Sequence, residues 1–157
     1  MSTILYPTRG GESTHLNQDW VFEFTREEGA SLLLLYVSNV RFLDLLAGPA
    51  RLDLMEAELD ELGEFLLAMA QERAETAGVA AGTIVRRGSF RDALKEVLLE
   101  HQATTVVLGY PSQETAFTTH DFINTLAQFL QNEFAVEVYV IDEGEIVEHY
   151  TKSSAEI

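Results

Sequence analysis

A short polar segment after the first apolar run contains the residues best placed to bind an anion. Gly10 and Gly11 are followed by Ser13 and Thr14, where a helix is expected to begin. Glycines ahead of a helix N-terminus allow backbone amides to approach a phosphate. The lysine and the spacing of a P-loop are missing, however, so an ordinary strand-to-helix turn explains this segment better.

The other chemically capable residues do not form a catalytic or metal-binding pattern. The histidines, His15, His101, His120 and His149, are not spaced as paired metal ligands, and the chain has no cysteine. No G-x-S-x-G nucleophile motif is present, and helix capping explains Ser89 better than catalysis does. We therefore predict no catalytic residue and no metal site.

The charge of the chain limits its partners. Its 157 residues include 10 basic and 26 acidic ones, which gives a net charge of −16. A field of this sign repels nucleic acid and anionic membranes, and the cluster of Arg86, Arg87 and Arg91 is too small to offset it. The longest apolar run, residues 32–37, is far shorter than a membrane span, and the N-terminus does not read as a signal peptide. We expect a cytoplasmic protein without nucleic-acid or membrane partners.

Short apolar runs alternate with longer amphipathic segments along the chain. The runs predict buried strands and the segments between them predict helices. The predicted strands are residues 3–8, 31–37, 82–87, 104–108 and 135–141. This alternation indicates right-handed crossovers and a doubly wound, mainly parallel α/β sheet. We expect one domain over residues 1–151 and a flexible tail over residues 152–157.

Two shorter features lie outside this alternation. After a turn at Asp142-Glu143-Gly144, residues 146–150 alternate in polarity and predict a sixth strand that forms a hairpin. Between the second strand and the long helix, Phe42, Leu45 and Leu46 predict a short helical turn.

The shorter predicted helices have caps and inward-facing apolar residues. Ser13 or Thr14 caps the first, a capping box starts the third at Ser89, and Thr118 or Thr119 caps the fourth. The residues expected to face the core are Leu16, Trp20 or Val21 and Phe24 in the first helix, Leu94, Val97 and Leu98 in the third, and Phe122 or Ile123, Leu126 and Leu130 in the fourth.

The longest predicted helix covers residues 51–77 and ends at Gly78. Glu56, Asp60 and Glu64 line its polar face, where a solvated surface explains them better than a divalent-ion site does. The stripe expected to face the core consists of Leu52, Met55, Leu59, Leu62, Leu66 and Met69.

Several segments, in order and spacing, resemble the universal stress protein family. Ile4-Leu5-Tyr6-Pro7-Thr8-Arg9-Gly10 is similar to that family's I-L-V-P-V-D-G, and Ala103-Thr104-Thr105-Val106-Val107-Leu108-Gly109 to its A-D-L-I-V-M-G. Glu28-Gly29-Ala30-Ser31-Leu32 corresponds to L-G-A-E-L, and Val85-Arg86-Arg87-Gly88 to V-R-x-G. The resemblance covers residues 3–141.

The resemblance implies a five-stranded parallel sheet in the order 3-2-1-4-5. It also implies a ligand crevice between strands one and four, where the strand order reverses. Many family members bind ATP there through G-x2-G-x9-G-[ST] after strand four. The positions of this chain that correspond to such a crevice are Thr8, Arg9, Gly10, Val37, Gly109, Ser112, Asn124 and Thr125.

The chain departs from the family's ATP-binding pattern. Gly109 matches the first glycine, but Ser112 replaces the second. Asn124 and Thr125 correspond to the third glycine and the hydroxyl residue, with a spacer two residues longer. The added side chains occupy space that phosphate needs. We therefore predict that ATP with magnesium binds weakly, if at all.

Arg9 replaces the strand-one aspartate that usually meets the adenosine in the family. In one interpretation Arg9 pairs with Glu12, Glu114 or another acid of the crevice and closes the site. In the other, Arg9 anchors a small anion together with the amides of Gly10-Gly11 and Gly109.

The function implied is that of a non-enzymatic regulatory or binding protein of the universal stress type, with ATP, AMP or another small anion as the candidate ligand. One alternative is a purely protein-interacting member with an empty cleft, and another is an adenine-nucleotide hydrolase or transferase of related fold. The resemblance also implies a homodimer through the fifth strand. That contact would involve Val136-Glu137-Val138-Tyr139-Val140 and the tail strand from Ile146 to Tyr150.

Overall fold

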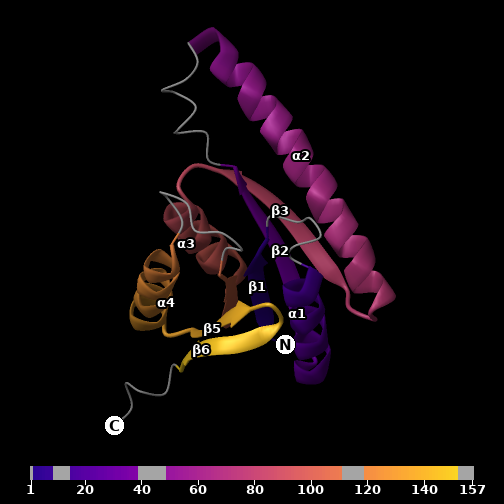
Figure 1. Ribbon diagram of the computed structural model, residues 1–157, viewed down its shortest axis with the longest axis vertical. Helices are drawn as coiled ribbons and strands as arrows, with labels where there is room; N and C mark the ends of the chain where they lie inside the picture. The colour runs from indigo at the N-terminus through magenta and orange to yellow at the C-terminus, as the bar shows by residue number, and fades with distance from the viewer. Residues whose placement is uncertain (1, 9–14, 39–48, 111–118, 152–157) are drawn as a thin grey trace.

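A computed structural model describes residues 2–8, 15–38, 49–110 and 119–151, apart from the side chains of residues 49–57 and 59. Strands and helices alternate along these residues, as the sequence predicts (Figure 1). The elements are β1 (Thr3–Pro7), α1 (His15–Glu28), β2 (Ser31–Ser38), α2 (Pro49–Thr76), β3 (Ala81–Arg87), α3 (Phe90–His101), β4 (Thr105–Gly109), α4 (His120–Phe134), β5 (Glu137–Asp142) and β6 (Glu145–Tyr150).

The strands of these described ranges form one sheet in the order β3-β2-β1-β4-β5-β6. The pairings from β3 through β5 are parallel, whereas β6 runs antiparallel to β5. The predicted order 3-2-1-4-5 and the hairpin strand are therefore both confirmed. The sixth strand pairs with the fifth strand of its own chain, so β6 and β3 are the outer strands of the sheet.

Helices cover both faces of the central strands (Figure 1). Helices α1 and α2 pack on one face, where Ile4 and Tyr6 of β1 meet Val21 and Phe22 of α1. Helices α3 and α4 pack on the other face against Leu5 and its neighbours. The predicted inward residues of α3 and α4 are buried: Leu94, Val97, Leu98, Ile123, Leu126 and Leu130.

The helix boundaries follow the predicted capping residues. The Ser89 hydroxyl accepts a hydrogen bond from the backbone N–H of Asp92 at 3.2 Å, and Thr119 accepts one from Phe122 at 3.0 Å. Each cap satisfies an amide that the first turn of a helix leaves unpaired. Gly78, which the sequence predicts to end α2, has a φ of +84°.

Helix α1 differs from its predicted orientation. Leu16, predicted to face the core, is 60% exposed, whereas Asn17 and Gln18 are buried. The two amide side chains lie inward because they bond to groups at the ends of strands and to α2. Hydrogen bonding, and not hydrophobic periodicity, thus sets the orientation of this first turn.

Helix α2 is rotated relative to the predicted stripe. Leu62 and Met69 are exposed and Leu66 is only half-buried, so this part of the predicted core face is wrong. The residues that pack toward the sheet are instead Gly63, Leu67, Ala70 and Ala74. Small side chains on this face allow the helix axis to approach the strands closely.

The polar face of α2 also differs in one respect from the solvated surface that the sequence predicts. Glu64 is exposed, but Asp60 accepts a hydrogen bond from Arg87 Nε of β3 at 2.8 Å. Asp60 therefore connects α2 to the outer strand β3.

Some predictions concern residues outside the described ranges. These are the cap at Ser13 or Thr14, the alternative cap Thr118, the helical turn with Phe42, Leu45 and Leu46, the side chains of Leu52, Met55, Glu56 and Leu59, and the tail over residues 152–157.

We predict that Gly63→Ala destabilises the protein even though alanine favours helix by about 1 kcal/mol over glycine. A Cβ at position 63 would lie 2.4 Å from Cδ1 of Tyr36, so the ring would have to move. Overpacking of this kind costs roughly 1–3 kcal/mol, which exceeds the helix-propensity gain. Thermal or urea unfolding monitored by circular dichroism measures the difference.

In a Tyr36→Ala background the same substitution should become stabilising, because the steric conflict is gone. A Gly63→Ala variant that is more stable than the parent protein would show that α2 does not pack against Tyr36 as described.

Candidate functional site

The carboxyl ends of β1 and β4 separate at the point where the strand order reverses. Their pairing joins Ile4 to Thr105 and Leu5 to Val106, and it stops before β1 ends at Pro7. In a doubly wound sheet this position is the usual place of a ligand crevice. Helices α1 and α4 follow these two strands along the chain.

Thr8, directly after β1, is buried at this edge. Its hydroxyl accepts a hydrogen bond from Gln18 Nε2 at 3.5 Å, and it also bonds to the side chain of Tyr6. Burial raises the pKa of Tyr6 to about 12, so the phenol stays protonated and neutral at physiological pH. Gln18 in turn accepts a hydrogen bond from Arg73 Nη1, and Arg73 Nη2 donates to Asp19 at 2.7 Å. The Thr8 hydroxyl is thus part of a polar network that links β1, α1 and α2.

Gly109, at the end of β4, lies against the side chain of Asn17. A Cβ at position 109 would lie 3.1 Å from Asn17 Nδ2. The Asn17 Oδ1 atom accepts a hydrogen bond at 2.8 Å from the N–H of Gly144, in the turn between β5 and β6. Asn17 therefore joins the end of β4 to the hairpin turn, and glycine at position 109 leaves room for its amide.

Tyr110 forms a hydrogen bond with Asn124, the residue that corresponds to the third glycine of the family pattern. Its hydroxyl donates to Oδ1 of Asn124 at 3.0 Å. Its ring stacks on His120, with centroids 4.0 Å apart and planes at 5°. These contacts place Asn124 near Gly109 in space, and they occupy its side-chain oxygen.

Asn124 lies inside helix α4 and not at its N-terminus. The helix begins after its cap Thr119, and the N–H of Ile123 already bonds to the Thr119 carbonyl at 3.1 Å. Only the first four amides of a helix lack an intrahelical partner, so the amide of Asn124 is already used. The neighbouring Thr125 is exposed, and Asp121 adds a carboxylate to the first turn.

The remaining predicted site residues are separate from this cluster or undescribed. Val37 is half-buried and packs on the core beneath α3 and α4. Arg9, Gly10 and Ser112 lie outside the described residues, as do Glu12 and Glu114, so both interpretations of Arg9 remain predictions.

Ser38 is a polar residue of this edge that the sequence reasoning missed. It is buried at the end of β2, and its carbonyl accepts a hydrogen bond from the N–H of Gly88 at 3.0 Å. Its hydroxyl has no hydrogen-bond partner among the described residues. The sequence does contain a signal for Ser38, because it follows a continuous apolar run that predicts a buried strand. In a parallel sheet the residue at the end of such a strand lies at the ligand-binding edge.

Comparison with known proteins identifies the family. The model of the Universal stress protein family matches residues 1–119. The chain belongs to the universal stress protein family. No curated protein matches this universal stress protein in sequence.

Solved structures share the fold at low sequence identity. A universal stress family protein from Burkholderia pseudomallei is 20% identical, with a TM-score of 0.68 over 89% of this chain and 95% of that one. A universal stress protein in complex with cAMP is 19% identical, with a TM-score of 0.63 over 89% and 96% of the two chains. An Arabidopsis thaliana family protein with AMP bound is 15% identical, with a TM-score of 0.61 over 90% and 92%.

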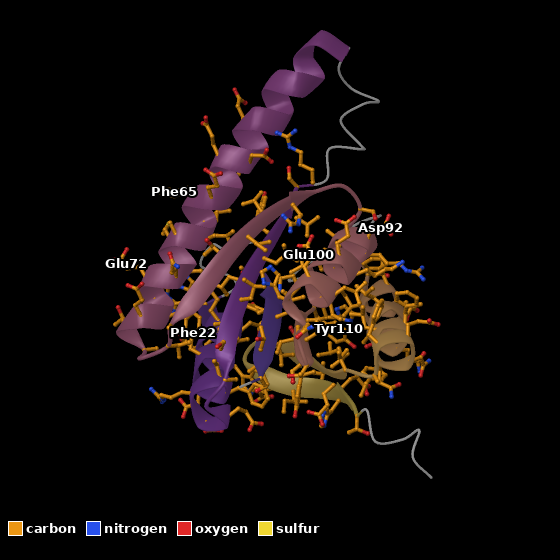
Figure 2. The ribbon with its side chains drawn as sticks, turned by 180° about the vertical axis from the view of Figure 1, so that it is seen from behind. Phe22, Phe65, Glu72, Asp92, Glu100 and Tyr110 are labelled. Atoms are coloured by element: carbon orange, nitrogen blue, oxygen red, sulfur yellow. The ribbon has the colours of Figure 1, made fainter. Side chains whose placement is uncertain are left out.

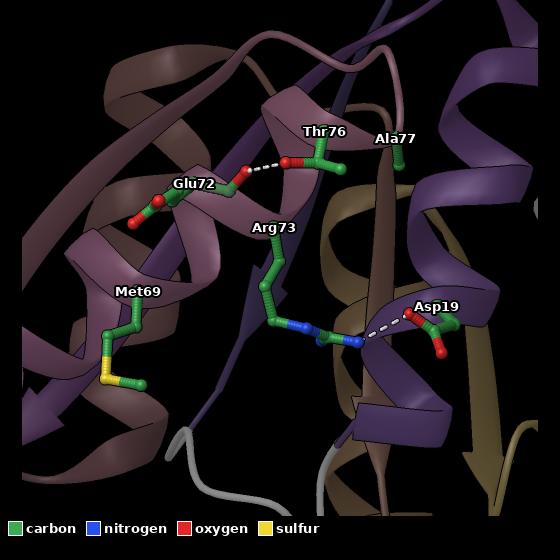
Figure 3. A pocket seen from close by; sticks show the side chains of 6 residues that line it. All are labelled: Asp19, Met69, Glu72, Arg73, Thr76 and Ala77. Atoms are coloured by element: carbon green, nitrogen blue, oxygen red, sulfur yellow. Dashed lines mark hydrogen bonds and ion pairs between the residues drawn. The ribbon is translucent and has the colours of Figure 1, made fainter.

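This universal stress protein also has a hollow between α1 and α2 (Figure 3). It measures about 420 Å³, and the Arg73–Asp19 ion pair crosses it at 2.7 Å. Its lining residues are Asp19, Met69, Glu72, Arg73, Thr76 and Ala77. These residues belong to α1, to α2 and to Ala77 directly after it, so the hollow is distinct from the edge where β1 and β4 separate.

Two further findings apply to the described ranges only. No group of three or more histidine, aspartate or glutamate side chains is arranged to hold a metal ion. None of the helices there combines the length and the hydropathy required to cross a bilayer.

Proposed function

We propose that this universal stress protein is a non-enzymatic regulatory or binding protein that holds an adenine nucleotide or another small anion only weakly. The ligand would lie in the crevice between β1 and β4. The relatives with cAMP and AMP make nucleotides the first ligands to test. The observation that carries the proposal is the position of Asn124 inside α4, where its amide has no free N–H for a phosphate.

The first turn of α4 is poorly suited to a phosphate for two further reasons. Thr119 already accepts the N–H of Phe122, so one of the free amides is used by the cap. Asp121 places a negative charge where an anion would otherwise gain from the helix dipole. The net charge of −16 adds to this repulsion.

The described polar groups of the crevice are largely engaged with one another. Thr8 accepts from Gln18, Asn17 accepts from Gly144, and Asn124 accepts from Tyr110. A ligand would have to replace these hydrogen bonds to reach the same atoms, which reduces its net gain. The buried Ser38 hydroxyl offers a polar group at the same edge of the sheet.

We predict that isothermal titration calorimetry gives dissociation constants above about 100 μM for both MgATP and AMP. Binding of either ligand then contributes no more than about 5.5 kcal/mol of favourable free energy. Asp121→Asn should tighten binding by about two- to fivefold, because a charge at a helix N-terminus contributes about 0.3–1 kcal/mol. Glu133→Gln removes the same charge at the far end of α4 and should leave binding unchanged.

A micromolar or tighter constant for the parent protein would contradict the proposal. Sustained conversion of ATP to ADP would instead support the hydrolase alternative. Equal effects of Asp121→Asn and Glu133→Gln would show that the helix N-terminus does not contact the anion.

We also propose a homodimer, in the cytoplasm, through the edge formed by β5 and β6. Both sides of β5 are already paired, so the backbone that remains for strand addition belongs to β6. Ile146 and Val147 of β6 are 49% and 41% exposed. An outer strand with unpaired backbone groups and exposed apolar side chains favours pairing with a second copy.

Light scattering of the parent protein at micromolar concentration should then give the mass of a dimer. Val147→Lys should shift the mass toward the monomer, because a charged edge strand resists pairing. Leu99→Lys makes the same change at an exposed site on α3, and it should leave the dimer intact. A monomeric parent protein, or equal effects of the two variants, would rule out this contact.

A further inference from the structure

Helix α2 has a second apolar face that the sheet does not bury. Leu62, Phe65 and Met69 are 46%, 60% and 47% exposed. They follow one another at intervals of three and four residues and therefore form one stripe along the helix. We call these three residues the α2 seam.

The seam has the form of a surface that packs against another helix. Apolar residues at alternating intervals of three and four are the contact positions of paired helices. Figure 2 shows Phe65 on the side of α2 that faces away from the sheet. The helix has 28 residues, or about 42 Å at 1.5 Å per residue, and extends past the sheet in Figure 1.

We propose that the α2 seam is a docking surface for a basic amphipathic helix of another protein. The proposed contact uses α2, whereas the weak ligand site lies between β1 and β4. The proposal therefore goes beyond the crevice function and stands or fails independently of it.

The negative charge around the α2 seam favours a basic partner. Glu58, Glu61 and Glu72 of α2 are exposed around the seam. Two described cations contact α2 or belong to it, and both are paired: Arg73 donates to Gln18 and Asp19, and Arg87 of β3 donates to Asp60. A partner helix with lysine or arginine beside its apolar stripe would meet these carboxylates with opposite charge.

A second copy of the chain fits the seam poorly. Two copies joined at α2 would bring the same acidic residues together, and each copy has a net charge of −16. Like charges across an interface disfavour association. The dimer proposed above uses β6, which leaves α2 available.

The hollow between α1 and α2 extends the seam at its C-terminal end (Figure 3). Met69 belongs to both surfaces, and Asp19 and Glu72 line the hollow. A lysine or arginine of the partner would lay its aliphatic stem on Met69 and place its charged end near Glu72, because Asp19 is already paired with Arg73. This is a second feature that favours a basic occupant.

The test uses a fluorescent synthetic peptide of three heptads, with leucine along one face and lysine on the flanks, and a matched peptide with glutamate in place of lysine. Fluorescence anisotropy should show binding of the lysine peptide and none of the glutamate peptide. Leu62→Gln with Phe65→Gln should weaken binding by about tenfold or more, because exposed apolar anchors carry most of the energy of such contacts.

Leu99→Gln is the control, because Leu99 is 61% exposed on α3 and the substitution leaves the charge unchanged. The affinity of this control variant for the lysine peptide should stay within about twofold of the parent value.

Three outcomes would overturn the proposal. Equal weakening by both variants, or none by the seam variant, would show that the peptide is held by general charge attraction. If the seam variant alone lowers the melting temperature by several degrees, the seam packs within its own chain. If it alone abolishes self-association, a second copy occupies it.

Discussion

A parallel sheet whose central strands are buried on both faces is the constraint on which this structure depends. Parallel strands need crossover connections, and right-handed crossovers place α1 and α2 on one face and α3 and α4 on the other. Burial on both faces requires continuous apolar strands, as in the run from Leu32 to Leu35. The same constraint brings the carboxyl ends of β1 and β4 to one edge, where polar residues can meet.

That edge is shaped by tertiary hydrogen bonds more than by the motif of the family. Asn17 joins Gly109 to the hairpin turn, and Tyr110 covers Asn124. Helix α4 begins at His120, four residues before Asn124, and has a carboxylate in its first turn. The family's fold is thus retained, while Thr8 and Asn124, two of the described residues that correspond to the family's crevice, form hydrogen bonds within the chain.

Much of the fold could be predicted from the sequence, because strands buried on both faces are continuous apolar runs and the caps at Ser89 and Thr119 are local signals. The orientation of α2 could not, because exposed Leu62 and Met69 are more apolar than Gly63, Ala70 and Ala74, which pack on the sheet. What decides the orientation is shape, since Gly63 fits under the ring of Tyr36. The sequence predicts a candidate site at the edge where β1 and β4 separate. The hydrogen bond of Asn17 there joins residues 127 positions apart, so no sequence periodicity indicates it.

We propose that this protein holds an adenine nucleotide only weakly between β1 and β4. The most direct test is to purify the protein without added nucleotide, denature it, and identify the small molecules it releases by mass spectrometry. We expect less than about one adenine nucleotide per ten chains, because a ligand held more weakly than about 100 μM is lost during purification. Release of close to one nucleotide per chain would contradict it.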